Sequence, residues 1–298
     1  IGNKIVAATE QERYDLCKHS RNLPIDAIKS CLKKFELKIS DIDNLILTTD
    51  FKIAVNELYL KPALKNKDDL TRLIKEIDRV KKYLEIEDEV KKKLKYKGQL
   101  TTHEHHLCHL ASAYFPSGFK KSIILSLDGI GQFETGKLAI GNNGKIKLCK
   151  FEANYPDSLG LIYSAVTYFL GWKHHSDEGI VMGLAPYGNQ YKKIPGKKFT
   201  YIDIFRKIIK KTKYLGIKID KEWIAYHLKR DVWVSKKFES FFGNKRKPNG
   251  KITQHHKNIA AALQFRLEEI VLDNLRKIKK KYQIDNLCIA GGVGLNCS

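Results

Sequence analysis

The sequence predicts an α/β fold, because apolar runs of strand length occur between longer segments of helical periodicity. The run Ser122–Leu127 has the length of a strand and ends at Asp128-Gly129. Two further segments, Gly136–Ile140 and Lys145–Phe151, flank a Gly-Asn-Asn-Gly turn, which is typical of a β-hairpin. A buried strand is also expected at Asp285–Ala290, directly before a pair of glycines.

A ribonuclease-H-like nucleotide-binding unit begins with this order of elements: a strand, an Asp-Gly turn, a hairpin and a further strand. The Gly-Asn-Lys turn near the start, with a strand expected at Ile5–Ala8, resembles the end of a second such opening. Two units of this kind make the actin-like ATPase fold. We therefore expect a duplicated ribonuclease-H-like fold, truncated at both ends, over residues 1–298, with halves of about 1–100 and 101–298.

In the first half, helical periodicity predicts a helix at Pro24–Phe35, and the Lys/Glu-rich stretch 68–97 is expected to be mostly helical. A buried strand is expected at Asn44–Thr48. The charged stretch from Glu10 to Lys18-His19 is predicted to be a loop. Either it is solvated, or its Lys18 meets a phosphate or carbonyl oxygen.

In the second half, an apolar helix is expected at Pro156–Leu170, a partly helical insertion at Lys192–Gln254 and a long helix at His255–Tyr282. The octet Val181–Gly188 has two glycines and a proline, which suits either a backbone that closely approaches a ligand or an ordinary buried turn. Gly291-Gly292 follows the last strand, where backbone N–H groups can face a nucleotide.

The histidine-rich stretch T-T-H-E-H-H-L-C-H favours a helix from about residue 102 to Pro116. His105 and His109 are four residues apart and therefore lie on one face of this helix, as pairs of metal-binding imidazoles often do. Asp128, at the end of the next strand, is a candidate third ligand. Two imidazoles and a carboxylate suit Fe(II), Mn(II) or Zn(II). An incidental His-rich helix start is the alternative.

The composition restricts the class of protein. The net charge of +22 favours phosphate-bearing partners, but the lysines are spread along helices without interleaved aromatics. A solvated surface is therefore a better interpretation than dedicated nucleic-acid binding. There is no apolar run of membrane-spanning length, so no membrane partner is expected, and six cysteines without a C-x-x-C pair fit reduced thiols in a cytoplasm. A chain that begins at Ile1 is expected to lack its natural start.

Taken together, these motifs resemble the carbamoyltransferase family that includes nodulation protein U and the antibiotic O-carbamoyltransferases. Five blocks match in order, and they span most of the chain. They are the Glu12-Arg13…Lys18-His19 loop, the helix His105–His109, the turn Leu127-Asp128-Gly129, the block Met182–Gly188 with Pro156–Gly171 before it, and Ala290–Cys297.

The resemblance implies an ATP-dependent O-carbamoyltransferase. In such enzymes a separate C-terminal domain, absent here, processes carbamoyl phosphate, and ATP adenylates the carbamate. The carbamoyl group of carbamoyladenylate then moves to a hydroxyl of a sugar or natural product at a divalent metal, with Fe²⁺ first and Mn²⁺ or Zn²⁺ as alternatives. A further metal-ligand Asp is expected after Ser298. The interpretation also allows a homodimer.

The resemblance also assigns roles to residues of this sequence. Lys18 would sit near the carbamoyl or phosphate group, and His19 is the nearest candidate for the base that activates the acceptor hydroxyl. The metal ligands would be His105, His109 and Asp128. The nucleotide would be lined by Gly129, Gly183, Gly291, Gly292 and Asn296.

Two other functions remain open at this point. The related enzyme that places threonylcarbamoyl on tRNA adenosine shares the fold and the His-x-x-x-His helix, and the positive charge would suit tRNA. The M-G-L-A-P-Y-G block and the second His of H-H-x-x-H fit the small-molecule branch better. A non-catalytic actin-like nucleotide-binding module is the other alternative, although such a module gains little from a metal set.

Overall fold

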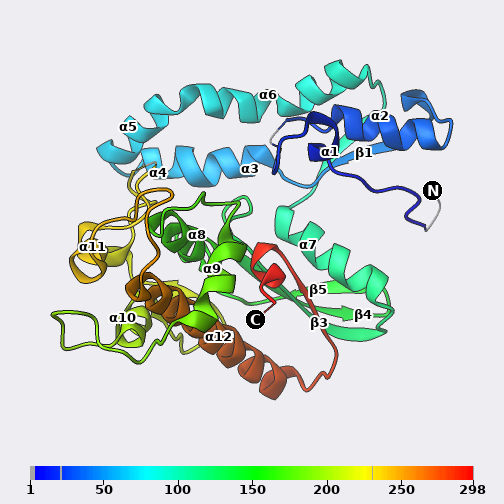
Figure 1. The fold of residues 1–298 in the computed structure, drawn as a ribbon. Helices are drawn as coiled ribbons and strands as arrows, with labels where there is room; N and C mark the ends of the chain where they lie inside the picture. Colours follow the sequence, from blue (N-terminus) through cyan, green and yellow to red (C-terminus); the bar gives the residue numbers. More distant parts are fainter. Residues whose placement is uncertain (1–3, 21, 230, 298) are drawn as a thin grey trace. The chain divides into compact units, whose positions relative to one another are not determined.

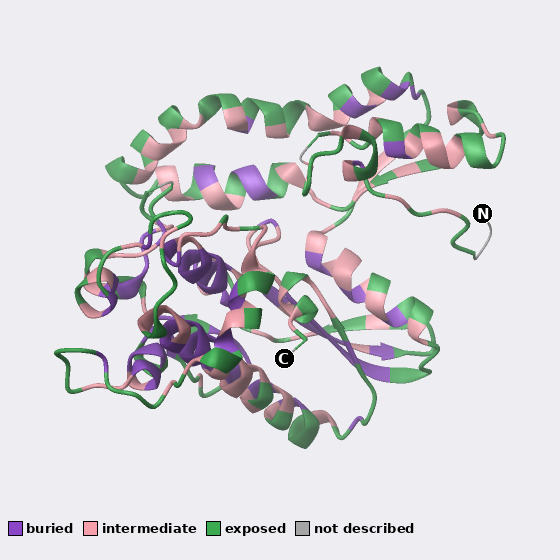
Figure 2. Ribbon diagram, viewed as in Figure 1, coloured by how far each residue is buried: buried purple, intermediate pink, exposed green. Residues whose placement is uncertain are grey.

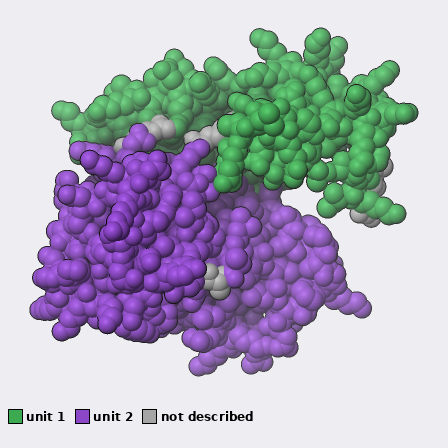
Figure 3. Space-filling view, in the orientation of Figure 1, with its two compact units in different colours: residues 1–104 green, residues 105–298 purple. Residues whose placement is uncertain are grey.

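The computed structural model describes residues 4–20, 22–229 and 231–297. The chain divides into two compact units, residues 1–104 (unit 1) and 105–298 (unit 2), which Figure 3 colours separately. The elements of each unit are labelled in Figure 1.

Unit 1 is mainly helical. Its helices are α1 (Glu12–Asp15), α2 (Ile25–Lys34), α3 (Phe51–Val55), α4 (Lys61–Ala63), α5 (Lys67–Lys75) and α6 (Ile77–Leu94), with short turns of 3₁₀ helix at Ile39–Asp41 and π-helix at Asn56–Leu60. Two strands, β1 (Asn44–Leu47) and β2 (Gln99–Thr102), pair in parallel. The helices predicted at 24–35 and 68–97 are therefore confirmed.

Three expectations for unit 1 are wrong. Ile5–Ala8 is not a strand: the segment has no regular structure, and Ile5 is 85% exposed. The strand β1 is not buried, because its only strand partner in the described chain is β2, and Ile46 is 51% exposed. The charged loop contains a short helix, α1. In each case the local apolar or charged pattern did not reveal which neighbours the segment would have.

Unit 2 combines a mixed sheet with helices. Its strands are β3 (Lys121–Leu127), β4 (Gly136–Asn142), β5 (Lys145–Cys149), β6 (Ile209–Lys210), β7 (Lys218–Ile219) and β8 (Leu287–Ala290). Its α-helices are α7 (His105–Tyr114), α8 (Leu159–Phe169), α9 (Glu178–Leu184), α10 (Tyr201–Ile208), α11 (Lys236–Phe242) and α12 (Gln254–Tyr282). Turns of 3₁₀ helix are η3 (Phe115–Ser117), η4 (Ala185–Tyr187), η5 (Lys221–Trp223) and η6 (Gly292–Leu295).

The main sheet has the order β5-β4-β3-β8. Its first three strands form an antiparallel meander, and β8 pairs with β3 in parallel. The predicted hairpin is confirmed, and its two turn residues, Asn143 and Gly144, have φ values of 46° and 76°. Two successive positive φ angles define the turn type that matches the twist of a hairpin, and they explain why Asn-Gly occurs there.

Helices cover both faces of this sheet. Residue Ile124 of β3 packs with Leu110 and Tyr114 of α7 on one face. The alternating residues Ile123, Leu125 and Leu127 belong to the larger core on the other face. From α8 and α12 this core includes Leu159, Ile162, Val166, Leu263, Ile270 and Ile278. Figure 2 shows α8 almost entirely in purple, with further purple along β3 and the first part of α12. The alternation places Ser126 on the α7 face, where the candidate site lies.

Some details of unit 2 differ from expectation. Helix α7 begins at His105 and not near residue 102, because Gln99–Thr102 forms strand β2. The octet 181–188 is neither a turn nor a loop but is helical, in α9 and η4. Strand β8 is buried only at Cys288.

Gly188 of this octet does approach another backbone closely, but that backbone belongs to α12 of the same protein and not to a ligand site. A Cβ on Gly188 would lie 2.1 Å from the carbonyl oxygen of Lys257 in α12.

The structure confirms an α/β protein with a mixed sheet. The predicted duplication of a ribonuclease-H-like unit stays a prediction, since the described residues of unit 1 contain a two-stranded sheet and unit 2 a four-stranded one. Within the described residues, no helix is both long enough and apolar enough to cross a membrane.

Candidate metal centre

Helix α7 and strand β3 bring the three predicted ligands together. Nε2 of His105 and Nε2 of His109 lie 3.0 Å and 3.1 Å from the same oxygen, Oδ2 of Asp128. The two imidazole nitrogens are themselves 3.0 Å apart. In the part of the chain that the structure describes, this is the one group of three such side chains with the spacing of a metal site.

Hydrogen bonds alone do not satisfy this triangle of atoms. If both imidazole nitrogens carry a proton and donate to the carboxylate, two N–H groups oppose each other at 3.0 Å. If only one carries a proton, the unprotonated nitrogen of the other ring faces a carboxylate oxygen, and both are acceptors. A cation between the three atoms removes this conflict.

The distances fit such a cation. Metal–ligand bonds of about 2.1 Å place neighbouring corners of an octahedron about 3.0 Å apart. Two imidazoles and a carboxylate on one triangular face leave the opposite face open, which is the arrangement of non-haem Fe(II) centres. The donor set therefore fits a divalent transition metal.

The second oxygen of Asp128 is held by backbone N–H groups. Gly129 and Gly292 donate to Oδ1 at 2.7 Å and 3.1 Å. Burial opposes the charged form of Asp128, but the neighbouring imidazoles of His105 and His109 and the N–H of Gly129 favour it and hold the pKa of this carboxyl well below its usual range. The carboxylate is thus ionised and oriented before any ligand arrives.

The glycine pair after β8 is explained by this contact. A Cβ on Gly292 would lie 2.7 Å from Oδ1 of Asp128. Gly291 has φ 88°, and a Cβ there would lie 2.3 Å from the carbonyl oxygen of Leu127. We predicted that this pair lines a nucleotide, and the structure places it against the carboxylate of the candidate metal centre.

Sequence reasoning missed Ser158, the N-cap of α8. Its hydroxyl lies 3.1 Å from the carbonyl oxygen of Asp128 and 2.7 Å from that of Gly129, and it accepts the N–H of Leu161 at 3.0 Å. A Cβ on Gly160 would lie 2.7 Å from the nitrogen of Gly129, so the helix start packs tightly on this turn. A serine directly before an apolar helix is a capping signal, but nothing local says what else it contacts.

Two buried side chains hold the start of α7 in place. The side-chain amide oxygen Oε1 of Gln132, a fully buried residue, accepts the N–H of His105 at 2.9 Å. His106 is also fully buried, and its ring nitrogens lie 2.8 Å from Oγ of Ser126 and 2.9 Å from the carbonyl oxygen of Glu134. Burial lowers the pKa of His106, which favours the neutral imidazole. Through its two hydrogen bonds this side chain connects α7 to the sheet.

Asn296, predicted to line the nucleotide, belongs to a polar cluster of α8 and α12. Its side-chain amide forms a reciprocal pair with Gln264, with both N···O distances 2.9 Å. Tyr163 donates to the same glutamine at 3.0 Å. Gln264 also lines a cavity of about 190 Å³ with Pro186 of η4.

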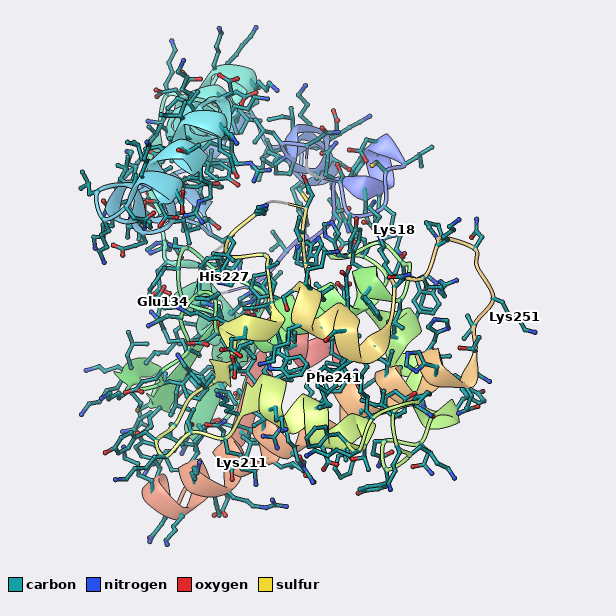
Figure 4. All side chains as sticks on the ribbon, turned by 90° about the vertical axis from the view of Figure 1, so that its left-hand side faces the viewer. Lys18, Glu134, Lys211, His227, Phe241 and Lys251 are labelled. Carbon is teal, nitrogen blue, oxygen red and sulfur yellow. The ribbon has the colours of Figure 1, made fainter. Side chains whose placement is uncertain are left out.

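The remaining predicted residues belong to other elements of the chain. Gly183 is on α9, and a Cβ there would have no neighbour within 4 Å. Lys18 and His19 belong to unit 1 and are exposed, in the turn after α1, and Figure 4 labels Lys18. The N–H of His19 donates to Glu12 at 2.7 Å. The catalytic roles of Lys18 and His19 stay predictions.

The fold and the site together define an α/β domain with a candidate divalent-metal centre at the carboxyl end of β3. The chain belongs to the family described as carbamoyltransferase N-terminus, whose model matches residues 2–298. The resemblance inferred from the motifs is thereby confirmed.

Two of the curated relatives match nearly the whole chain, and a third matches about two thirds of it. The nodulation protein NolNO of Sinorhizobium fredii is 33% identical over 304 residues, which cover 99% of this chain and 40% of that protein. The uncharacterized protein sll1178 of Synechocystis is 31% identical over 306 residues, covering 98% of this chain and 48% of that protein. The nodulation protein NolO of Bradyrhizobium diazoefficiens is 34% identical over 195 residues, covering 65% and 32%. The chain thus spans less than half the length of these relatives.

Among solved structures, the Aquifex aeolicus Ppx/GppA phosphatase matches with a TM-score of 0.25 and 13% identity, covering 72% of this chain and 68% of that one. A score this low carries no conclusion about the fold.

Proposed function

We propose that this chain is the transfer domain of an ATP-dependent O-carbamoyltransferase that moves the carbamoyl group of carbamoyladenylate to a hydroxyl of a sugar or natural product. Family membership supports carbamoyl transfer in general. The observation that carries the proposal is the triangle of His105, His109 and Asp128, whose donor atoms lie 3.0–3.1 Å apart.

The proposed reaction has three steps. Water hydrolyses carbamoyl phosphate to carbamate and inorganic phosphate. Carbamate then attacks the α-phosphate of ATP to give carbamoyladenylate and pyrophosphate, and finally the acceptor hydroxyl attacks the carbamoyl carbon, loses its proton and releases AMP. A bound divalent cation, Fe²⁺ in the first instance and Mn²⁺ or Zn²⁺ as alternatives, supplies Lewis-acid polarisation of the carbonyl and neutralises phosphate charge.

The chain's own residues orient the reacting groups. The ionised carboxylate of Asp128 and the two imidazoles leave one side of the centre open to the carbamoyl group. The N–H groups of Gly129 and Gly292 fix the carboxylate, so its position needs no rearrangement during transfer. We propose that the nucleotide lies along Gly291, Gly292 and Asn296, that Lys18 approaches its carbamoyl or phosphate group, and that His19 takes the proton of the acceptor hydroxyl.

Metal analysis of matched histidine variants tests the centre. His109→Ala is expected to remove one equivalent of Fe²⁺ per chain, whereas His103→Ala is expected to retain it, because His103 is an exposed histidine of the same stretch outside the triangle. Equal metal content in both variants would refute the centre.

The activity is tested in a protein that carries this chain and has the length of the relatives. With ATP and carbamoyl phosphate it is expected to exchange labelled pyrophosphate into ATP without any acceptor, because adenylation is reversible. Release of AMP upon addition of hydroxyl acceptors should then be lost in His109→Ala and kept in His103→Ala. Acceptor-dependent AMP release that persists in both variants would contradict the proposed role of the centre.

A further inference from the structure

Unit 2 contains a cavity of about 240 Å³ whose lining includes four lysines. They come from three separate segments: Lys150 follows β5, Lys213 lies between β6 and β7, and Lys277 and Lys281 lie in the last turns of α12. Glu152 is the one carboxylate among the lining residues. Tyr214 and Leu215 complete the wall.

Two of these ammonium groups are neutralised within the protein. Nζ of Lys150 lies 3.0 Å from Glu152. Nζ of Lys277 lies 2.6 Å from Asp273 and donates to the carbonyl oxygen of Thr212, also at 2.6 Å. The cavity's only lining carboxylate is therefore already engaged.

The other two ammonium groups have no carboxylate partner among the described residues. Lys213 and Lys281 each lie over the ring of the tyrosine that follows in sequence, at 5.6 Å and 5.1 Å from the ring centroids. A ring at this distance is a weak partner for a cation at an exposed position. Like charges around one hollow repel each other, and a bound anion would relieve this repulsion.

The wall that carries Lys213 is fixed by backbone contacts. Gly216 is clamped by the buried side chain of Asn274 in α12, which accepts its N–H at 2.9 Å and donates to its carbonyl at 3.0 Å. On the other side, the N–H of Glu152 donates to the carbonyl oxygen of Leu215 at 3.0 Å. A Cβ on Gly216 would lie 2.3 Å from the carbonyl oxygen of Glu152. The backbone next to Lys213 is thus held in place by α12 and by Glu152 before any ligand binds.

This cavity is separate from the candidate metal centre. His105 and His109 lie on α7, which covers one face of the main sheet, and Lys277 and Lys281 lie on α12, whose core residues pack with the other face. In Figure 4, Lys211 lies beside the end of α12 at the lower edge of the molecule, and its Nζ is 3.6 Å from Asp273, the partner of Lys277.

We propose that the cavity, with its four lysines (the lysine pocket), binds a small ligand carrying two or more phosphate groups. The two unneutralised ammonium groups match at least two negative charges, and the partly neutralised pair provides further hydrogen-bond donors. Tyr214 and Leu215 offer an apolar side for an organic group. The inference does not depend on the carbamoyl-transfer proposal, since no residue of the metal centre takes part.

Calorimetry with inorganic pyrophosphate tests the lysine pocket, with EDTA present so that no metal contributes. The variant Lys213→Gln/Lys281→Gln is compared with Lys192→Gln/Lys251→Gln. Both remove two positive charges, and the control lysines are exposed and do not line the pocket. Figure 4 shows Lys251 on a loop far from Lys211. We expect the pocket variant to bind pyrophosphate at least about tenfold more weakly than the wild type, and the control to stay within about twofold.

Chemical labelling locates the ligand directly. Pyridoxal 5′-phosphate carries a phosphate and an aldehyde, which condenses with a lysine amine to form an imine and water, and borohydride reduction then fixes the adduct. Labelling at Lys213 or Lys281 that pyrophosphate suppresses supports the pocket. Three results would overturn the proposal: equal weakening of pyrophosphate binding in both variants, labelling spread over lysines outside the pocket, or no pyrophosphate binding by the wild type.

Discussion

Replacing Ser158 by alanine tests whether the start of α8 holds the candidate metal centre in shape. In the folded protein this hydroxyl caps α8 through the N–H of Leu161 and lies within hydrogen-bond distance of the carbonyl oxygens of Asp128 and Gly129. Ser158 is itself fully buried, so water cannot replace the lost contacts easily. The substitution therefore acts both on stability and on the turn that carries the carboxylate.

The magnitude follows from these contacts. Loss of an N-cap costs about 1 kcal/mol. Leaving a buried carbonyl oxygen without its donor adds about 1–2 kcal/mol. We therefore expect Ser158→Ala to lower the free energy of unfolding by about 2–3 kcal/mol, and a displaced Asp128 to weaken metal binding by about 10–100-fold, as for other groups that orient a metal ligand.

Ser235 provides a matched control, because it caps α11 through the N–H of Phe238 and donates to Glu222, away from the centre. Ser235→Ala is expected to cost about 1 kcal/mol and to leave metal affinity unchanged. Urea unfolding measures the first quantity and competition with a chromophoric chelator the second. If Ser158→Ala lost no more stability than Ser235→Ala and bound metal as tightly as the wild type, the positioning role of Ser158 would be refuted.

Further predictions concern the glycines, a buried histidine and an ion network. Gly188→Ala should destabilise by about 1–3 kcal/mol, because its Cβ would collide with a carbonyl of α12, whereas Gly183→Ala should be neutral or stabilising in the same urea titration. His106→Ala should cost about 3 kcal/mol yet retain one metal per chain in elemental analysis. Burial alone would raise the pKa of Glu269, but hydrogen bonds from two arginines lower it, so its stabilisation is present above its unfolded pKa of about 4.3 and is lost as pH falls through the folded pKa. Glu269→Gln should therefore lower the melting temperature at pH 7, and its difference from the wild type should shrink steadily as the pH falls below about 4.3.

The sequence predicted well those features whose cause lies within a few residues. The four-residue spacing of His105 and His109 fixes their common face on any helix. The Asn143-Gly144 turn has the positive φ angles that its hairpin requires. The long helix, expected at 255–282, is found at Gln254–Tyr282, since its apolar stripe extends over many turns.

Expectations that depended on distant neighbours were less successful. The apolar segment Ile5–Ala8 resembles a strand, but a strand exists only where a partner completes its hydrogen bonds, and none in the described chain does so. The octet 181–188 has the glycines of a ligand-binding turn. Its Gly188 is instead required by the close approach of α12, about 70 residues away in the chain.

The sequence by itself determined the class of the fold, the family and the identity of the three candidate ligands. Only the tertiary structure decided how the carboxylate is held, because its partners are far apart in the chain: Ser158 is 30 residues from Asp128, and Gly292 is 164 residues from it. Helix and turn geometry is encoded locally by backbone sterics and hydrogen bonds. The position of Asp128 depends on the parallel pairing of β3 with β8 and on the packing of α8, which no local pattern specifies.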